Sequence, residues 1–495
     1  MERIAIIGLG ISGSACLAAY QHLAQSHDFE LTVFDRDPYF GRGIPFTESY
    51  EGALMNTRNA GLTYDQAYPG DFDAWLQAKD PDRDWPDYSS RHLYGAYLRE
   101  RVEELIARLP VQAVKEYVVK LDFDRVQAAW RLETESGQTY SGFDRIHLCC
   151  GDLGTRDFYH LQGTPRYLNQ AYPLEAERYE LDREGPRRFA VIGTSLSAID
   201  VIKYLADTCQ PDQILAFSRG NQFPIVSGEE ATDLPWRFLS EENFQEALKS
   251  EEGLSYKHLD QWIQSECQNL NLSWTECQEV TLSTGLEGIR RAMDWTDQGA
   301  VLEALATRVT RLLFHYWQYL SLSDRQAFTD KYDKVFSLAK GKMPLASANS
   351  LLDLADQGCL VSCSGVDEVV YDRLTDRYYL LDEEGMALEE VDFIVNATGI
   401  NLDLRQDLPE ESLLYDLRNA GWLNPDPGQG VSLDVNHYQL ISPRFGRLDH
   451  VHPHGLLIAP SVYHNNSTTT IQRYAQDVVN WHYCGQDYQQ SGLWP

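Results

Sequence analysis

The sequence has little positive charge and no long apolar run. Lys and Arg together number 42 against 74 Asp and Glu, which gives a formal net charge of -32 at pH 7. Such an acidic surface repels polyanions, so we expect neither nucleic acid nor an anionic membrane as a partner. No apolar stretch approaches the roughly 20 residues that span a bilayer. The chain opens on the strand-like MERIAIIG without a secretory leader pattern, and a cytoplasmic protein is expected.

The nine cysteines lack the C-x-x-C spacing of metal clips and dithiol redox motifs. They are odd in number and scattered along the chain. Cys149 and Cys150 are adjacent, so on a strand they would point to opposite faces. We therefore expect free thiols in a reducing compartment, and neither a redox pair nor a bound metal.

Two segments show a strand, a helix and a second strand in succession. The first has an apolar run at Arg3–Ile7, apolar residues at helical spacing, and a second apolar run at Leu31–Phe34. The second has a strand from Phe189, a helix over about Leu196–Leu205, and the strand ILAFS. A chain of 495 residues is long enough for two or three domains. We predict an α/β fold with two Rossmann-like dinucleotide-binding domains and a helical insertion.

The first unit carries a glycine motif between its strand and its helix. Gly8 permits a tight turn, Gly10 lets a pyrophosphate approach the backbone, and Gly13 lets the helix pack on the strand. The free N–H groups of the helix start face the diphosphate. Asp35 ends the second strand, where an acid accepts hydrogen bonds from the adenosine ribose. The candidate cofactor contacts here are Gly8, Gly10, Ile11, Ser12, Gly13 and Asp35.

The position of this motif and the segments that follow it favour FAD over NAD. An N-terminal motif followed by a second nucleotide unit is the layout of flavoproteins with two dinucleotide-binding domains. Arg42 lies between two glycines in FGRGIPF and can reach the pyrophosphate or the isoalloxazine. The segment LMNTRNAG follows, with Asn56 in it.

At these residues the chain resembles a known family. The segments FDRDPYFGRGIPF, LMNTRNAGL and SSRHLYGAYLRE are similar to those of bacterial FAD–NAD(P)-binding proteins, relatives of the flavin-containing and N-hydroxylating monooxygenases. The resemblance is strongest over the first 100 residues or so, recurs at the second glycine motif and NATG, and is poor across the helical insertion. It implies that Gly8, Gly10, Gly13, Asp35, Asn56 and Arg42 contact FAD.

The same resemblance implies the activity of the protein. The expected protein is an FAD-dependent, NADPH-using monooxygenase that hydroxylates a small amine or another soft nucleophile through a C4a-hydroperoxyflavin. No side chain stands out as catalytic, because the cofactor carries this chemistry. Fold alone does not fix the reaction. An NAD(P)H-dependent reductase or oxidase without oxygenation, and a flavin-binding regulatory protein, therefore stay as alternatives.

The second glycine motif predicts an NADPH site. It has the form Gly193-x-Ser195-x-x-Ala198, in which serine and alanine are small enough for close approach. Ser218 and Arg219 end the next strand. An acid there would repel a 2′-phosphate, whereas an arginine with an adjacent hydroxyl favours it.

Two turns and one helix start complete the candidate cofactor contacts. The strands HLCCGD and VNATG end at turns that contain Gly151 and Gly399, which we interpret as hinges or cofactor-lining turns. The C-terminal helix begins in a hydroxyl-rich segment with Thr469 and Thr470. Its counterpart in the resembled family lies beside the flavin ring, where a helix dipole stabilises negative charge.

His450, His452 and His454 alternate in DHVHPHG and on a strand would share one face. A three-histidine metal site, a pocket lining near flavin or substrate, and ordinary surface or core histidines are all open. Pro453 interrupts the strand, and no fourth ligand has a matching spacing.

The motifs together predict the division of the chain into domains. The FAD-binding domain takes residues 1–170 and 396–495, the NADP-binding domain takes 185–234 and 348–395, and a helical insertion takes 235–347. The expected partner is a small-molecule substrate. Whether the protein forms a homo-oligomer is left open.

Overall fold

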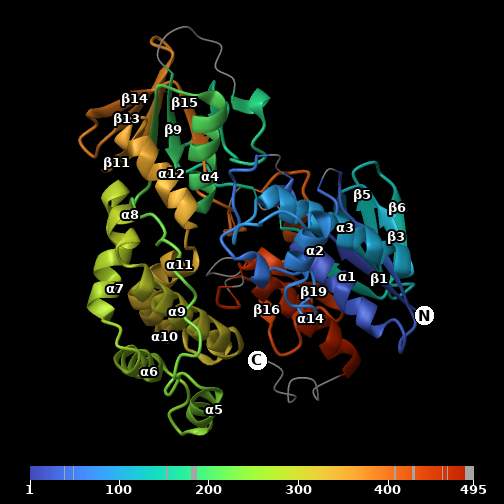
Figure 1. The fold of residues 1–495 in the computed structure, drawn as a ribbon. Coiled ribbons are helices and arrows are strands. Elements are labelled where there is room, and N and C mark those ends of the chain that lie inside the picture. The colour runs from blue at the N-terminus through green and yellow to red at the C-terminus, as the bar shows by residue number, and fades with distance from the viewer. Residues whose placement is uncertain are drawn as a thin grey trace. The chain divides into compact units, whose positions relative to one another are not determined.

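The computed structural model describes residues 1–37, 39–47, 50–151, 154–179, 187–405, 408–425, 430–459, 461–464 and 466–484 (Figure 1). The chain divides into two compact units. The first comprises Met1–Ser49, Thr57–Gly154 and Asn401–Pro495, and the second comprises Tyr50–Asn56 and Thr155–Ile400. Residues 155–170, which the sequence analysis grouped with the first domain, belong to the second unit, and so does the helical segment.

The first unit is built on a five-stranded parallel sheet in the order β19-β7-β1-β2-β3. In the central strand, Ile4, Ala5 and Ile6 are fully buried, so both faces of the sheet are covered. Helix α1 packs between α14 and α3. The bounds of these elements are β1 Glu2–Ile7, α1 Ile11–Leu23, β2 Phe29–Phe34, α3 Arg91–Arg108, β3 Val111–Val114, β7 Arg145–Leu148, β19 Val451–Pro453 and α14 Thr468–Cys484.

A three-stranded antiparallel sheet also belongs to the first unit, and β6 of this sheet contacts β1. Its strands are β4 Val118–Asp124, β5 Ala129–Thr134 and β6 Thr139–Phe143. The sequence analysis did not predict these strands. The remaining elements of this unit are the helices α2 Asp71–Lys79 and α13 Leu413–Asn419 and the short strands β16 Leu433–Asp434, β17 Gln439–Ser442 and β18 Gly446–Arg447.

The second unit repeats this architecture. Its parallel sheet has the order β11-β10-β9-β15-β8, and a second antiparallel sheet, β12-β13-β14, belongs to the same unit. The strands of both sheets are β8 Tyr167–Leu168, β9 Arg188–Ile192, β10 Gln213–Phe217, β11 Leu360–Cys363, β12 Glu368–Asp372, β13 Arg377–Leu381, β14 Ala387–Val391 and β15 Phe393–Asn396. Helix α4, Leu196–Tyr204, follows β9. The predicted α/β class with two Rossmann-like sheets is confirmed.

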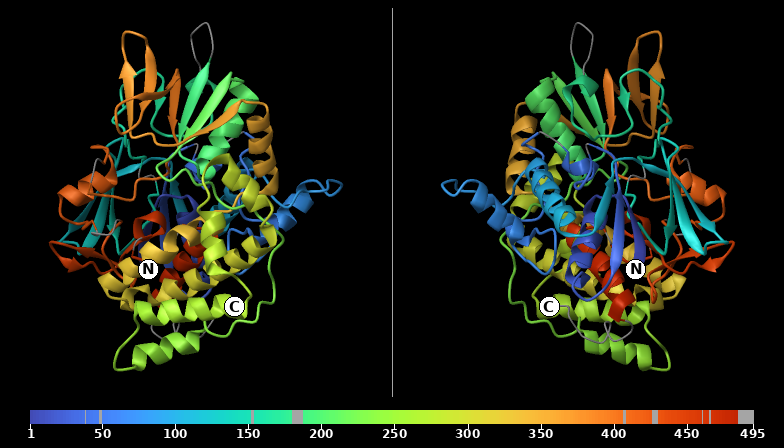
Figure 2. Two further views of the ribbon diagram at one scale, coloured as in Figure 1. Left: turned by 90° about the vertical axis from the view of Figure 1, so that its left-hand side faces the viewer. Right: turned by 90° about the vertical axis from the view of Figure 1, so that its right-hand side faces the viewer.

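A helical segment lies between β10 and β11. Its helices are α5 Glu241–Lys249, α6 Tyr256–Asn269, α7 Trp274–Thr281, α8 Gly285–Met293, α9 Thr296–Tyr316, α10 Leu322–Phe328, α11 Lys334–Lys340 and α12 Leu345–Asp356. Within the second unit, α5 and α6 lie far from its sheet, whereas α8 and α12 lie beside it (Figures 1 and 2). Among the described helices, none is long and apolar enough to cross a membrane.

A buried carboxylate organises the start of this helical segment. Glu266 on α6 is fully buried. Its Oε2 accepts hydrogen bonds from the backbone N–H groups of Phe238 at 2.7 Å and Leu239 at 2.9 Å. Asn269 donates to the other carboxylate oxygen at 2.8 Å. The side chain therefore anchors the loop before α5 to α6.

We expect Glu266→Gln to lower the free energy of unfolding by about 2 kcal/mol, because the amide oxygen can replace Oε2 but the amide nitrogen cannot accept the hydrogen bond from Asn269. Thermal or urea unfolding measures this loss. The matched control is Glu276→Gln, since Glu276 is exposed on α7. Equal stability of the two variants would contradict the anchoring role of Glu266.

Candidate dinucleotide-binding sites

Gly8 turns the chain sharply between β1 and α1. Its φ is +91°, and its N–H donates to the carbonyl of Phe34 at 2.8 Å. A Cβ at this position would lie 2.5 Å from the carbonyl oxygen of Cys149. At Gly13 a Cβ would lie 2.0 Å from the carbonyl oxygen of Gly8. Both positions therefore exclude any larger residue, and helix α1 starts close to the ends of β1 and β7.

The start of α1 is arranged to receive an anion. Gly10 is the N-cap residue and no side chain caps this end, in contrast to α3, where Ser90 Oγ accepts from the N–H of Leu93. The first-turn N–H groups, including those of Ile11 and Ser12, have no acceptor within the helix. They lie at the carboxyl ends of the parallel strands, where dinucleotides bind in such folds.

Asp35 is held against the glycine loop. Its Oδ2 accepts a hydrogen bond from the N–H of Leu9 at 2.7 Å, and its Oδ1 accepts one from the N–H of Arg36 at 2.8 Å. The residue is only 7% exposed. These two bonds fix the carboxylate at the end of β2, beside the turn, where the motif predicts a ribose.

The segment Gly41–Gly43 packs against the same loop. A Cβ on Gly10 would lie 3.6 Å from the Cα of Gly43, and one on Gly41 would lie 3.2 Å from the side chain of Val102. This contact brings the backbone of Arg42 to the start of α1. Burial lowers the pKa of Arg42, and the nearby charge of Arg99 lowers it further, while Asp37 opposes both. A bound phosphate would relieve this repulsion between cations.

Helix α14 begins at the same end of the sheet as α1. Near the start of α14, the ring of Tyr474 contacts that of His454, which lies just beyond the carboxyl end of β19. Further along α14, the hydroxyl of Tyr483 donates a hydrogen bond to Glu2 at the amino end of β1. The two helices therefore run parallel, and Thr469 and Thr470 lie in the first turn of α14. The hydroxyls of Ser467 and Thr470 lie 2.8 Å apart.

Gly455, which follows β19, lies against Ser12 in the first turn of α1, and this contact was not predicted from the sequence. Its φ is +62°, and a Cβ would lie 2.5 Å from the Oγ of Ser12. The turn after β19 therefore closes directly onto the first turn of α1. A glycine outside any motif carries no signal of such a contact in the sequence.

The second glycine loop is built in the same way. Gly193 has a φ of +130° and donates its N–H to the carbonyl of Phe217 at 2.7 Å. A Cβ on it would lie 2.7 Å from the carbonyl oxygen of Ala397, as a Cβ on Gly8 would lie against Cys149. The turns that contain Gly151 and Gly399 thus follow equivalent strands, β7 and β15. A Cβ on either glycine would meet nothing within 4 Å, so only the φ of +91° at Gly399 favours glycine, and Gly151 is not required by its surroundings.

The two serines of the second site differ in their surroundings. Ser195 is the exposed N-cap residue of α4, and its side chain makes no capping bond. The hydroxyl of Ser218 lies 2.9 Å from that of Thr194 and accepts from the N–H of Asn221 at 3.0 Å. Ser218 therefore shapes the turn after β10. Thr194 was not a candidate in the sequence analysis.

Cationic side chains gather beside Arg219. Its guanidinium carbon lies 5.4 Å from the centroid of the Phe158 ring, and that of Arg156 lies 4.8 Å from the same ring. Burial lowers the pKa of Lys334, the charge of Asp333 raises it, and the charge of Arg219 lowers it. Arg156 and Lys334 come from segments far from the glycine motif, so sequence spacing could not have indicated them.

Asn56 lies in the segment Tyr50–Asn56, which belongs to the second unit. The carbonyl of Gly52 in this segment accepts a hydrogen bond from Lys203 Nζ at 2.6 Å. The structure therefore assigns Asn56 and the first glycine loop to different units.

The three alternating histidines lie on the side of the sheet that carries Arg145 and His147, as the alternation predicts, because His450 and His452 lie 3.4 Å and 2.9 Å from the Arg145 guanidinium and His454 lies against His147. His450 has a φ of +68°, precedes β19 and is exposed, because the chain turns at this residue. His452 is buried, and its Nε2 lies 2.9 Å from Nη1 of Arg145. His454 is buried against His147, with ring nitrogens 2.9 Å apart. Among the described residues the three histidines do not form a group whose ligand atoms could hold one metal ion, and the Arg145 guanidinium lies against two of them.

A family model matches the N-terminal part of the chain. Residues 5–153 match a family model described as FAD-NAD(P)-binding. No curated protein matches the chain. Residues 5–153 thus have the sequence features of that family, and they contain the first glycine loop and Asp35.

Solved structures similar to the whole chain include hydroxylases and monooxygenases. The ornithine hydroxylase of Pseudomonas aeruginosa has a TM-score of 0.57 at 14% identity and covers 98% of both chains. The FAD-bound cadaverine monooxygenase of Erwinia amylovora has a TM-score of 0.55 at 14% identity, covering 98% of this chain and 94% of that one. The ornithine N-hydroxylase of a Kutzneria species, solved with reduced FAD, NADP⁺ and L-ornithine, has a TM-score of 0.52 at 13% identity and covers 99% of both chains. The chain therefore has the fold of flavoproteins with two dinucleotide-binding domains.

We expect Gly8→Ala to destabilise the protein by at least about 2 kcal/mol even without a ligand, because a left-handed φ and a backbone clash coincide there. Gly151→Ala is the control in the adjacent turn, where a Cβ meets nothing, and should change stability by less than about 0.5 kcal/mol. Urea unfolding of the ligand-free proteins measures both. Wild-type stability in Gly8→Ala would show that the turn does not require glycine.

Proposed function

We propose that this protein is an FAD- and NADPH-dependent monooxygenase that hydroxylates a small primary amine at nitrogen. The observation that carries the proposal is the repeated construction of two glycine loops, each at the carboxyl edge of its own parallel sheet. The fold shared with the cadaverine monooxygenase and the ornithine hydroxylases supports the reaction and the amine substrate.

The first unit fits FAD. The uncapped start of α1 faces the diphosphate with its N–H groups, and Arg42 supplies a nearby cation. Asp35, held by Leu9, accepts from the adenosine ribose. The start of α14, with Thr469 and Thr470, directs its dipole to the same edge of the sheet and stabilises negative charge on the reduced ring.

The second unit fits NADPH. Gly193 and the exposed Ser195 leave the start of α4 open for the coenzyme diphosphate. At the end of β10 stands Arg219, with Arg156 and Lys334 close by, and a group of cations is what a 2′-phosphate requires. NADH has a free hydroxyl at that position and gains nothing from these charges.

FAD held at the Gly8 loop and reduced by NADPH would supply the activation of O₂, of which one oxygen atom would go to the amine nitrogen and the other to water. In this proposal each unit of the chain holds one of the two dinucleotides. This accounts for the absence of a catalytic motif in the sequence.

Anaerobic titration with NADPH tests the activity. We expect the FAD-loaded protein to lose its flavin absorbance with about one equivalent of NADPH, and much more slowly with NADH. On admission of air, with ornithine or cadaverine present as the probe, the expected product is the hydroxylamine.

Two results would contradict the proposal. Hydrogen peroxide formed in step with NADPH consumption, whichever amine is supplied, would show an oxidase. A bound flavin that neither nicotinamide reduces would point to a regulatory role.

Substitutions in the cationic group of Arg219, Arg156 and Lys334 test the preference for NADPH over NADH. We expect Arg219→Ala and Lys334→Ala each to raise the Kd for NADPH by about 10- to 100-fold, which is about 1.4 to 2.8 kcal/mol, and to leave the Kd for NADH unchanged. The control is Arg373→Ala, on the exposed turn between β12 and β13. Equal losses for both coenzymes would show that these side chains do not contact the 2′-phosphate.

A further inference from the structure

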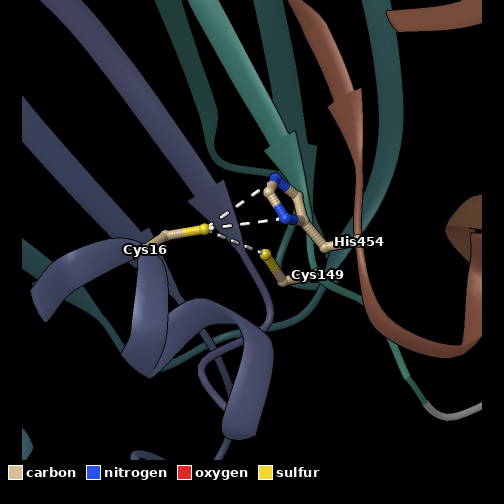
Figure 3. Close-up of side chains that lie close together, drawn as sticks. All are labelled: Cys16, Cys149 and His454. Atoms are coloured by element: carbon tan, nitrogen blue, oxygen red, sulfur yellow. Dashed lines mark hydrogen bonds between the residues drawn. The ribbon is translucent and has the colours of Figure 1, made fainter. Parts of the chain in front are cut away.

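Three metal-ligating side chains from distant parts of the chain converge inside the first unit. Cys16 comes from α1, Cys149 from the end of β7 and His454 from just beyond β19, and they point toward one another (Figure 3). One ligand atom from each lies within 4.8 Å of the other two. All three residues are buried, with Cys16 fully so.

The spacing of the ligand atoms fits a metal centre with three ligands. With metal–sulfur bonds of about 2.3 Å and metal–nitrogen bonds of about 2.0 Å, a trigonal centre separates its sulfurs by about 4.0 Å and sulfur from nitrogen by about 3.7 Å. The observed separations are 4.0 Å between Cys16 Sγ and Cys149 Sγ and 3.9 Å between Cys16 Sγ and His454 Nδ1. A disulfide would need the sulfurs at about 2.0 Å.

A second layer of polar groups orients the imidazole. His454 Nε2 lies 2.9 Å from His147 Nδ1, and His147 Nε2 lies 2.7 Å from the hydroxyl of Tyr20. If His454 carries its proton on Nε2 and donates it to His147, Nδ1 holds the free lone pair. Cys16 Sγ lies 3.9 Å from Nδ1 and 3.8 Å from Nε2, so the ring turns on binding for Nδ1 to face a cation beside the sulfurs. Metal-binding histidines are usually held in this way, by a hydrogen bond from the other ring nitrogen.

We propose that Cys16, Cys149 and His454 bind one thiophilic d¹⁰ cation, Cu⁺ or Zn²⁺. Two thiolates and an imidazole are the donors that these ions select, whereas Mg²⁺ and Ca²⁺ take oxygen ligands. Three buried ligands suit Cu⁺, and Zn²⁺ would take a fourth ligand in addition.

The cation would stabilise the first glycine loop, which contains Gly8. It ties α1 to the ends of β7 and β19, and the carbonyl of Cys149 is the group against which Gly8 turns. Binding would therefore fix the strand end on which the glycine loop rests. This inference is independent of the coenzyme and of the reaction proposed above.

Elemental analysis of the full-length protein, purified without chelators, tests the site. We expect about one equivalent of zinc or copper per chain, falling to about 0.1 in Cys16→Ala and Cys149→Ala. The matched control is Cys267→Ala, because Cys267 is equally buried on α6 but lies apart from the cluster, and it should keep its metal. FAD content is measured on the same samples, so that loss of the fold and loss of metal are distinguished.

Titration of the metal-free protein distinguishes the two cations. Zn²⁺, Cu⁺ under reductant, and Co²⁺ as a spectroscopic probe are added separately, and thiolate-to-cobalt absorption is expected for wild type and Cys267→Ala only. Three results would overturn the proposal. They are no binding of any of the three ions, metal retained in both cluster variants, or a Cys16–Cys149 disulfide in the protein as purified.

Discussion

A glycine pressed against the carbonyl group of a neighbouring strand determines the shape of each proposed nucleotide site. Gly8 meets the carbonyl of Cys149, and Gly193 meets that of Ala397. In both cases the close approach lets the following helix start at the strand ends with its N–H groups exposed to a diphosphate. The remaining features of each site, an acid at Asp35 and cations near Arg219, are placed relative to that turn.

Local patterns in the sequence were sufficient for the two strand–helix–strand units and for the helical segment. The runs at Arg3–Ile7 and Leu31–Phe34 are almost entirely apolar because their sheet is covered on both faces, and this pattern indicates buried strands. The antiparallel strands β4 to β6 and β14 were missed. The strand β14, ALEEV, carries charged residues and shows no alternation. The strands β4 and β5 do alternate apolar and polar residues, as in KLDFD and WRLE, and this signal was not used.

Contacts between distant segments could not be predicted from spacing. Arg156 and Lys334 reach the Arg219 region only through the fold, and Gly455 meets Ser12 across more than four hundred residues. The alternation of the three histidines did predict their shared face, but Arg145, which lies against His450 and His452, comes from β7 and has no signal in their spacing. Likewise, the search for C-x-x-C spacing overlooked Cys16 and Cys149, which approach each other only in the folded unit. The strong net negative charge also gave no hint of the local cations, since a phosphate responds to the nearest charges.

The central claim is that FAD occupies the first glycine loop and NADPH the second. A crystal structure with FAD and NADP⁺ bound tests it most directly. The account predicts that the adenosine ribose of FAD lies within hydrogen-bond distance of the Asp35 carboxylate. It also predicts that the 2′-phosphate of NADP⁺ contacts Arg219 and Lys334. FAD at the Gly193 loop, or a 2′-phosphate that faces away from both cations, would contradict the account.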